Sequence, residues 1–291
     1  MKQLTTELDY NNGIGIVPDG EFRISASGIA DFFTNTTQWY RDNLLDEKSF
    51  IGNQSTLIGT IVHYCAEQFA KQQTLTDHNN QQITDYITKS TNDQYVDYIP
   101  DTSEQFTIEQ YKPMALELIN SYVRHNMPVV VEPFISMEIL PGIHVGGSID
   151  ALYNNQPLTT NELSSIDHTK PVTIVDYKTT SSLQAPTQFS YKYKLQLLTY
   201  AYVLKHKYNI TVDKLKLVYI TQHQVNRISE KTGKPLKDYP SKVSTIIHQL
   251  TDEDMDVIHN IIQLIAHSIQ HWNNHPEHHY LLAQDWRLHD N

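Results

Sequence analysis

Cysteine is nearly absent from this sequence, in which Cys65 is the one example among 291 residues. A lone cysteine excludes a disulfide within the chain, and it excludes an iron–sulfur cluster or zinc site built from several cysteines of this chain. Long apolar runs are absent too, and residues 1–7 lack the apolar core of a signal peptide. We therefore expect a cytoplasmic protein without a membrane partner.

Positive charge is also scarce. The sequence has 22 Lys and Arg residues against 33 Asp and Glu residues, and the net charge of −11 counts against a simple nucleic-acid coat protein. The cations are unevenly spread, however, because residues 170–216 hold eight lysines and two aspartates, a net charge of +6. Such a stretch either binds a phosphate backbone or forms a solvated helix face, and the sequence leaves both interpretations open.

A short apolar strand is the centre of the predicted fold. Residues 172–175 are Val-Thr-Ile-Val, which favours a buried strand, and Asp176, Tyr177 and Lys178 follow directly. Because side chains alternate along a strand, Asp176 and Lys178 point to one side. Upstream, Asp150 likewise stands at the end of a short apolar segment. Two carboxylates that share a divalent cation beside a lysine can hydrolyse a phosphodiester bond, whereas an isolated Asp-x-Lys pair is often a surface salt bridge.

Two predicted helices can supply further groups to this site. Residues 56–70 carry apolar side chains at helical spacing, with Gly59, His63 and Glu67 on one face. His63 is either a ligand at the site or a half-buried histidine paired with Glu67. Residues 191–208 form a second helix, on which Gln196 and Tyr200 share a face.

The other segments predict an α/β (α+β) fold. Residues 128–153 alternate or run apolar and predict a meander of strands that brings Asp150 beside the central strand, and residues 214–222 predict one more strand. We expect a helical insertion at about 71–127. A final helix begins after Thr251, which is followed by three acidic residues suited to a first turn.

Three parts are expected along the chain. The first is an N-terminal extension over residues 1–22, and the second is the main domain over residues 23–225. Residues 226–291 form a basic loop and a C-terminal helix packed on the core. The loop, at 226–242, is predicted to be either a DNA-contacting loop or a disordered tip.

Four short motifs follow one another in a characteristic order. They are Gly59-x-x-x-His63, Gly147-x-Ile149-Asp150, Asp176-x-Lys178 and Gln196-x-x-x-Tyr200. Together they resemble the RecB-like exonuclease branch of the PD-(D/E)xK nuclease superfamily, over residues 23–222. The resemblance implies a restriction-endonuclease-like core, a central mixed β-sheet flanked by helices, and the activity of a metal-dependent deoxyribonuclease.

The resemblance also implies a metal site. His63, Asp150 and Asp176 would be ligands, together with the backbone carbonyl of Tyr177. Mg²⁺ is the expected ion and Mn²⁺ a substitute, since oxygen ligands and open positions suit both. Lys178 would orient or deprotonate the attacking water, or offset charge on the phosphate.

Substrate contacts are implied for the facing helix. Gln196 and Tyr200 would brace the lysine and the DNA backbone, and we expect Lys192 and Lys194 in the basic stretch to bind the substrate as well. No helicase motif such as a P-loop is present, so the nuclease would act alone or with a separate recombination or helicase protein. Compact stand-alone members often serve virus-encoded recombination or repair.

Three features depart from the pattern of this branch. Ile149 stands where proline is common, the interval between Asp150 and Asp176 is long, and Cys65 alone cannot hold the iron–sulfur cluster of many relatives. Two other functions stay open, a structure-specific endonuclease with the same chemistry and a nucleic-acid-binding or assembly protein without turnover. The sequence is compatible with an oligomer, including a ring around DNA, without requiring one.

Overall fold

The computed structural model describes residues 21–44, 54–72, 78–95, 111–154, 162–229 and 231–275. The predicted N-terminal extension therefore lies outside the described residues except for its last two positions. Parts of the predicted insertion, at 73–77 and 96–110, also lie outside them, as do residues 276–291. The boundaries of the three predicted parts stay predictions.

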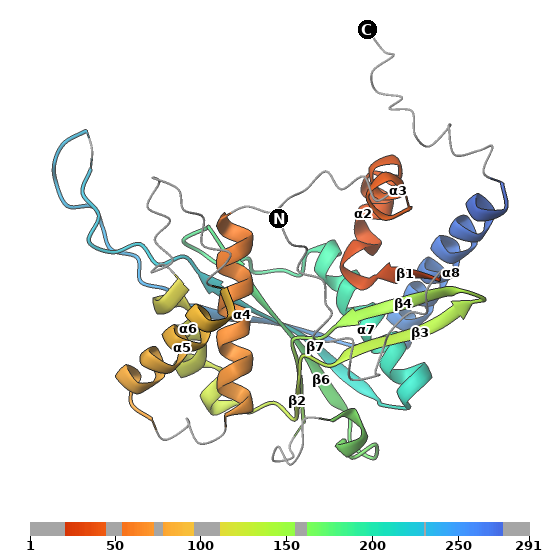
Figure 1. The fold of residues 1–291 in the computed structure, drawn as a ribbon, viewed down its shortest axis with the longest axis horizontal. Coiled ribbons are helices and arrows are strands. Elements are labelled where there is room, and N and C mark those ends of the chain that lie inside the picture. The colour runs from red at the N-terminus through yellow and green to blue at the C-terminus, as the bar shows by residue number, and fades with distance from the viewer. Residues whose placement is uncertain are drawn as a thin grey trace, which may run out of the picture.

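Two mixed β-sheets form the centre of the molecule (Figure 1). Their order is β2-β5-β6-β7-β8 in the larger sheet and β1-β4-β3 in the smaller one. The predicted mixed α/β architecture is confirmed, with two sheets where one was expected. The strands are β1 (Phe22–Ser25), β2 (Val130–Val131), β3 (Phe134–Leu140), β4 (Ile143–Ser148), β5 (Ala151–Tyr153), β6 (Val172–Thr180), β7 (Val212–Thr221) and β8 (Val243–Gln249).

The two sheets separate at Asp150. The sequence predicts one continuous strand over 144–153, but the structure divides it into β4, which pairs with β3, and β5, which pairs with β6. Between them Ile149 is fully buried, and its N–H donates to the carbonyl of Pro133 at 3.1 Å. The chain changes sheets at this point, which leaves Asp150 at the junction. The next residue, Ala151, pairs with Val175, the neighbour of Asp176 in β6.

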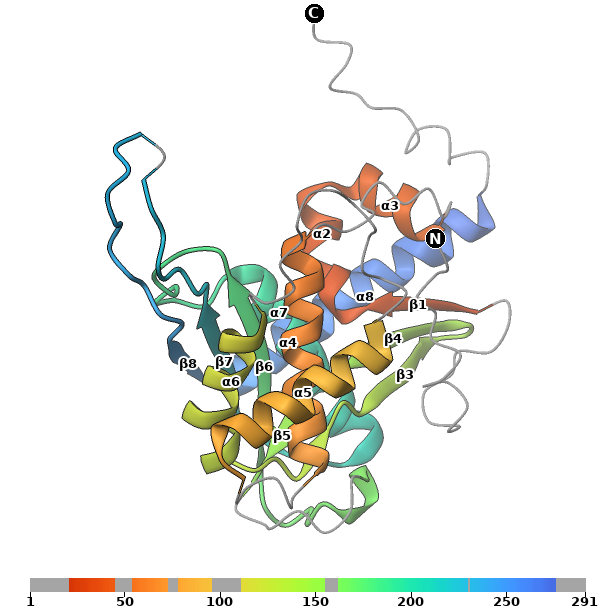
Figure 2. The ribbon, with the colours of Figure 1, turned by 60° about the vertical axis from the view of Figure 1, so that its left-hand side comes forward.

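Helices cover both faces of the larger sheet (Figure 2). On one face α7 packs with α2 and α8 in a core that also contains Ile174 of β6, and on the other face α4, α5 and α6 pack against Val175 and Tyr177. The predicted alternation along β6 is thereby confirmed. The helices are α2 (Ile29–Thr34), α3 (Thr36–Leu44), α4 (Gln54–Lys71), α5 (Asn80–Tyr95), α6 (Tyr111–Ser121), α7 (Tyr191–Tyr208) and α8 (Asp252–Asn274).

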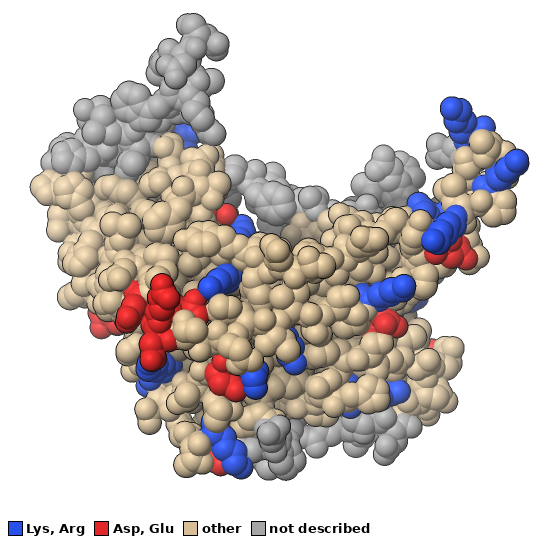
Figure 3. Space-filling model, turned by 180° about the vertical axis from the view of Figure 1, so that it is seen from behind, with Lys and Arg blue, Asp and Glu red and all other residues tan. Residues whose placement is uncertain are grey.

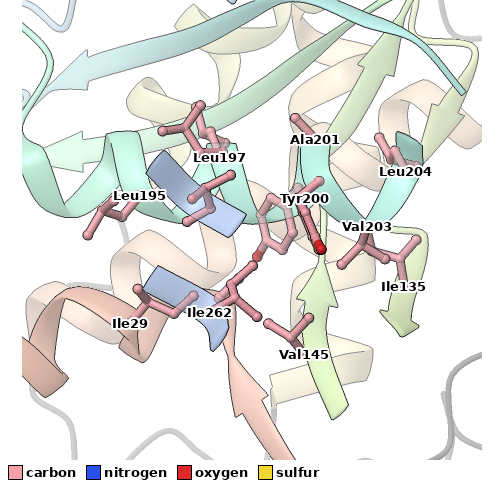
Figure 4. Packing of buried hydrophobic residues seen from close by; sticks show 14 of the residues in the cluster. Ile29, Ile135, Val145, Leu195, Leu197, Tyr200, Ala201, Val203, Leu204 and Ile262 are labelled. Atoms are coloured by element: carbon pink, nitrogen blue, oxygen red, sulfur yellow. The ribbon is translucent and has the colours of Figure 1, made fainter. Parts of the chain in front are cut away.

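Helix α7 has the bounds that the sequence predicts. The Ser190 side chain accepts the N–H of Tyr193 and caps its start, and Asn209 ends it with a left-handed backbone, φ 55°. Figure 4 shows Tyr200 of this helix among core side chains that include Val145 and Ile262. Among the described helices, none combines the length and the apolar character that a bilayer crossing requires.

Asp254 joins α8 to both neighbours. Its carboxylate accepts the N–H of Thr251 in a capping box, and it lies 2.8 Å from Lys194 Nζ on α7 and 2.7 Å from His248 Nε2 on β8. Burial opposes ionisation here, but Lys194, His248 and Thr251 together lower the pKa of Asp254 below its ordinary value.

We expect Asp254→Ala to lower the free energy of unfolding by about 2 kcal/mol at pH 7, because a cap and charged hydrogen bonds are lost. A carboxylate with a lowered pKa stabilises the fold fully above its ordinary pKa and loses this effect as the pH falls toward the lowered value, so the difference between the two proteins should begin to shrink below about pH 4 and still be present at pH 3. Urea unfolding at both pH values measures this difference. The exposed Asp252, in the same first turn, is the control, and its change to alanine should cost less than about 1 kcal/mol.

Candidate active site

Strand β6 places an acid and a base side by side at the end of its buried segment. Asp176 is 2 % exposed, and its Oδ2 lies 2.7 Å from Lys178 Nζ. Gln196 Nε2, on α7, donates to the other oxygen, Oδ1, at 3.2 Å. The contact with Lys178 is an ion pair without a well-directed hydrogen bond, since Oδ2 of Asp176 has no hydrogen-bond partner. A buried carboxylate oxygen is therefore open to a further partner.

Asp150 and His63 reach the same place from two other elements. Asp150 Oδ2 accepts the backbone N–H of Tyr177 at 2.6 Å, and it lies 3.3 Å from His63 Nδ1 on α4. The ring of His63 stands edge-on to the ring of Tyr177 at 5.9 Å. The sheet junction, the central strand and α4 thus bring together the three motifs that carry His63, Asp150 and Asp176. The role of the Tyr177 carbonyl as a ligand stays a prediction.

Electrostatics differ between the two aspartates. Burial raises the pKa of Asp176 to about 6, where Lys178 opposes the shift and the negative charge of Asp150 adds to it. Burial also opposes ionisation of Asp150, but His63, Lys178 and the Tyr177 N–H lower its pKa below the ordinary value. Burial opposes the charge of Lys178 as well, yet Asp176 and Asp150 raise its pKa above that of a free lysine. Lys178 is therefore a cation at neutral pH.

Helix α7 braces this constellation from the facing side. Gln196 Nε2 also donates to Tyr200 Oη at 3.4 Å, and both residues are buried. Tyr200 packs on the strand that leads to Asp150, because a Cβ added to Gly147 would lie 3.3 Å from its hydroxyl. Tyr193, one turn before Gln196, places its ring 4.8 Å from Lys178 Nζ, which favours the lysine as a cation. The sequence reasoning missed Tyr193, although its i, i+3 spacing from Gln196 was a signal.

Lys192 and Lys194 both form ion pairs with carboxylates of the fold. Lys192 Nζ lies 2.8 Å from Asp31 on α2, in a pair whose side chains are about half exposed. Lys194 is held by Asp254 on α8. Their contact with a substrate stays a prediction, and for Lys194 that contact would require the pair with Asp254 to be shared or broken.

Glu132 is a third acidic group beside the site, and the sequence reasoning missed it. Its backbone is left-handed, φ 49°, and its N–H donates to the carbonyl of Asp150 at 3.1 Å. Burial raises the pKa of Glu132 well above its ordinary value, and the charges of Asp150, Glu67 and Asp176 raise it further. A strained backbone beside several carboxylates that raise one another's pKa is typical of a functional position. The signal in the sequence was an apolar run, residues 129–131, that ends on a carboxylate as residues 172–175 do.

The donor set suits a hard divalent cation. Across the described ranges no cluster of three or more His, Cys, Asp or Glu side chains is arranged to hold a metal ion. The chemistry of the groups nevertheless fits one, because Asp150, Asp176 and Glu132 oppose one another's ionisation and Asp176 Oδ2 lacks a hydrogen bond. A cation among these oxygens would relieve that repulsion. His63 is the nitrogen donor within reach of Asp150.

Gly59 lets α4 approach β6 closely. A Cβ at Gly59 would lie 3.0 Å from Thr179 Oγ1, the residue after Lys178. We expect Gly59→Ala to push α4 away from β6 and to carry His63 from Asp150, which lowers the cleavage rate about fivefold. Stability should change little, because the gain in helix propensity of about 1 kcal/mol is opposed by the cost of the displaced contact with β6.

The double variant Gly59→Ala/Thr179→Ala tests the cause of that loss. Removal of the threonine hydroxyl makes room for the new methyl group, so activity should recover. Kinetics of cleavage together with thermal unfolding measure both effects. Equal activity of Gly59→Ala and wild type would contradict the close approach as a requirement.

Comparisons with known proteins concern the family and the fold of the chain. The family profile described as the PD-(D/E)XK nuclease superfamily matches residues 23–279, well beyond residue 222, where the motif resemblance ended. A crystal structure named "Putative exonuclease" from Eubacterium rectale superposes with a TM-score of 0.54 at 13% sequence identity, over 94% of this chain and 88% of that one. At this identity the likeness concerns the fold alone. A search of the curated proteins found no match.

Proposed function

Because the chain belongs to the PD-(D/E)XK nuclease superfamily, we propose that it is a metal-dependent DNA exonuclease of the RecB-like branch. One observation carries the proposal. The buried Asp176 and the protonated Lys178 lie on the central strand, the half-buried Asp150 faces them from the sheet junction, and His63 joins Asp150 from α4. This set fits hydrolysis of a phosphodiester bond by water.

A divalent cation, Mg²⁺ or in its place Mn²⁺, would polarise the phosphate and lower the pKa of a water molecule when held by Asp150, Asp176, His63 and the Tyr177 carbonyl. The raised pKa of Lys178 favours one of its expected roles over the others. A lysine held as a cation by Asp176 and Tyr193 donates hydrogen bonds and offsets negative charge on the phosphate, but it is a poor general base. Gln196 fixes Asp176 so that the acid keeps its position.

The wider role is proposed by the same resemblance. DNA is the expected substrate, and recombination or repair the expected process, alone or with a separate helicase or recombination protein. A cytoplasmic location, a virus-encoded origin and an oligomeric state are further parts of this proposal. The single cysteine, buried Cys65, supports a nuclease without an iron–sulfur cluster.

Linear and covalently closed circular DNA separate the candidate functions. Purified protein would be incubated with each form in Mg²⁺, Mn²⁺ or EDTA. Loss of linear DNA only, and only with metal, supports the exonuclease. Cleavage of both forms indicates an endonuclease with the same chemistry. Binding of DNA without cleavage in any metal would overturn the enzymatic proposal and favour a non-catalytic nucleic-acid-binding protein.

A further inference from the structure

Residues 222–242, here called the arm, extend the larger sheet beyond β7 and β8. For residues 226–242 the sequence predicts a DNA-contacting loop or a disordered tip, and in the structure most of the arm forms a hairpin that stands away from the body (Figure 1). Gln224 and Tyr239 exchange backbone hydrogen bonds of 2.8 and 2.7 Å, and Leu236 N–H donates to the Arg227 carbonyl at 2.8 Å. The pairing of Ile228 with Pro235 keeps the register of β7 with β8. The arm is therefore a direct continuation of the sheet.

The arm begins beside the candidate active site. Gln222 N–H donates to the carbonyl of Thr180, the last residue of β6, and Lys178 two residues earlier pairs with Tyr219 of β7. At about 3.3 Å per residue, the extended run from Gln222 to Ser229, where the chain turns, spans roughly 23 Å. This is about two thirds of one turn of duplex DNA, which is about 34 Å long. Figure 3 shows the arm projecting at the upper right, with basic side chains along it.

The charge of the arm is opposite to that of the whole chain. The sequence from 222 to 242 has five cations and two acids, in a protein of net charge −11. All five cations are exposed, and within the described part of the chain none of them forms an ion pair, whereas Lys192 and Lys194 do. Asp238 accepts the N–H of Asn226 and so belongs to the hairpin's own bonding. The cations are Arg227, Lys231, Lys234, Lys237 and Lys242.

We propose that the arm binds the phosphate backbone of the DNA substrate within one helical turn of the bond that is cut. The inference rests on the proposed function, and it names a surface that the hydrolytic residues do not use. Exposed cations that form no ion pair among the described residues, carried on a hairpin with paired backbones, suit a row of phosphates. The exposed Ile228 and Leu236, 64 % and 42 % exposed, lie on paired strands of the same hairpin and suit the sugar faces between phosphates.

The first test of the arm measures DNA binding under conditions that prevent cleavage. Fluorescence anisotropy with a 30-base-pair duplex in EDTA, over a salt series, would compare wild type with Lys231→Gln/Lys234→Gln/Lys237→Gln. Three lost phosphate contacts should lower the slope of log K against log salt by about 3 and weaken binding at least tenfold at low salt. The control removes three exposed lysines outside the arm, Lys89→Gln/Lys170→Gln/Lys205→Gln. An unchanged slope in the arm variant, or an equal change in the control, would overturn the proposal.

A shortened arm keeps the test independent of single side chains. Asn-Gly in place of residues 225–238 would close the hairpin directly on the Gln224–Tyr239 pair, a two-residue turn that such a ladder accepts. This protein should bind long duplex as weakly as the triple variant, yet cleave a DNA hairpin with a stem of about six base pairs at the wild-type rate. Equal affinity of the shortened and full arms for long duplex would contradict the proposal. If wild type cleaves no DNA, the proposed function fails, and the anisotropy comparison still decides whether the arm binds DNA.

Discussion

Lys178→Met is expected to reduce cleavage at least about 10³-fold while binding of DNA stays within a few-fold of wild type. Lys178 is held as a cation by Asp176, Asp150 and the ring of Tyr193, so its charge is available to the phosphate in the transition state. Loss of one preorganised charge or donor of this kind commonly costs a factor of 10² to 10³. Methionine keeps the length and packing of the side chain and removes the charge alone.

Single-turnover cleavage of end-labelled DNA at saturating Mg²⁺ measures this prediction. The control is Lys205→Met, which removes an exposed lysine from α7 and should leave the rate within about twofold. Thermal unfolding checks that the Lys178 variant remains folded. A Lys178→Met protein that cleaves at more than about a tenth of the wild-type rate would exclude the proposed electrostatic role.

Local patterns sufficed to predict the elements that carry the site. Helix α7 is predicted at its observed bounds from its helix-compatible residues and its apolar side, and the structure shows that Ser190 and Asn209 cap it at those bounds. The shared side of Asp176 and Lys178 follows from the two-residue period of a strand alone. His63 and Gly59 are one helical turn apart, so their common face follows from α-helix geometry.

Pairings between distant segments could not be predicted in the same way. The division of residues 144–153 into two strands depends on which partner each half finds, and the apolar pattern is the same in both cases. Lys194 was expected at the substrate, but its ion pair joins it to Asp254, sixty positions along the chain. Residues 226–242 were expected to form a loop because their side chains are mostly polar. Their register with the sheet is set by backbone pairing, which a side-chain pattern does not reveal.

Glu132 was overlooked because its position depends on the backbone. The two-residue strand β2 ends just before it, and a left-handed residue then turns the chain toward Asp150. A sequence pattern gives no warning of a positive φ at glutamate, which is an uncommon conformation for this residue type. The structure therefore adds to the predicted pair of aspartates a third carboxylate whose ionisation is disfavoured by its neighbours.

Glu132→Gln should make the metal-free protein more stable and the enzyme slower. The folded protein raises the pKa of Glu132, so the carboxyl resists ionisation in the fold while it ionises freely in the unfolded chain. An acid with a raised pKa lowers stability as the pH rises above its ordinary value. Glutamine lacks this penalty, and we expect a gain of at least about 1 kcal/mol at pH 8 in EDTA, with no gain near pH 4.

Metal should reverse the order of stabilities if Glu132 serves the site. A cation bound among the carboxylates favours the ionised glutamate, so Mg²⁺ should raise the melting temperature of wild type more than that of Glu132→Gln. Cleavage by the variant should fall about 10²-fold, as for groups that support a metal site. The matched control is Glu138→Gln, an exposed position on β3 whose amide oxygen can still accept the N–H of Gly142. A variant that is less stable than wild type at pH 8 in EDTA would show that Glu132 stabilises the fold and is a structural acid. A functional reason is needed only for a carboxylate whose ionised form destabilises the folded protein.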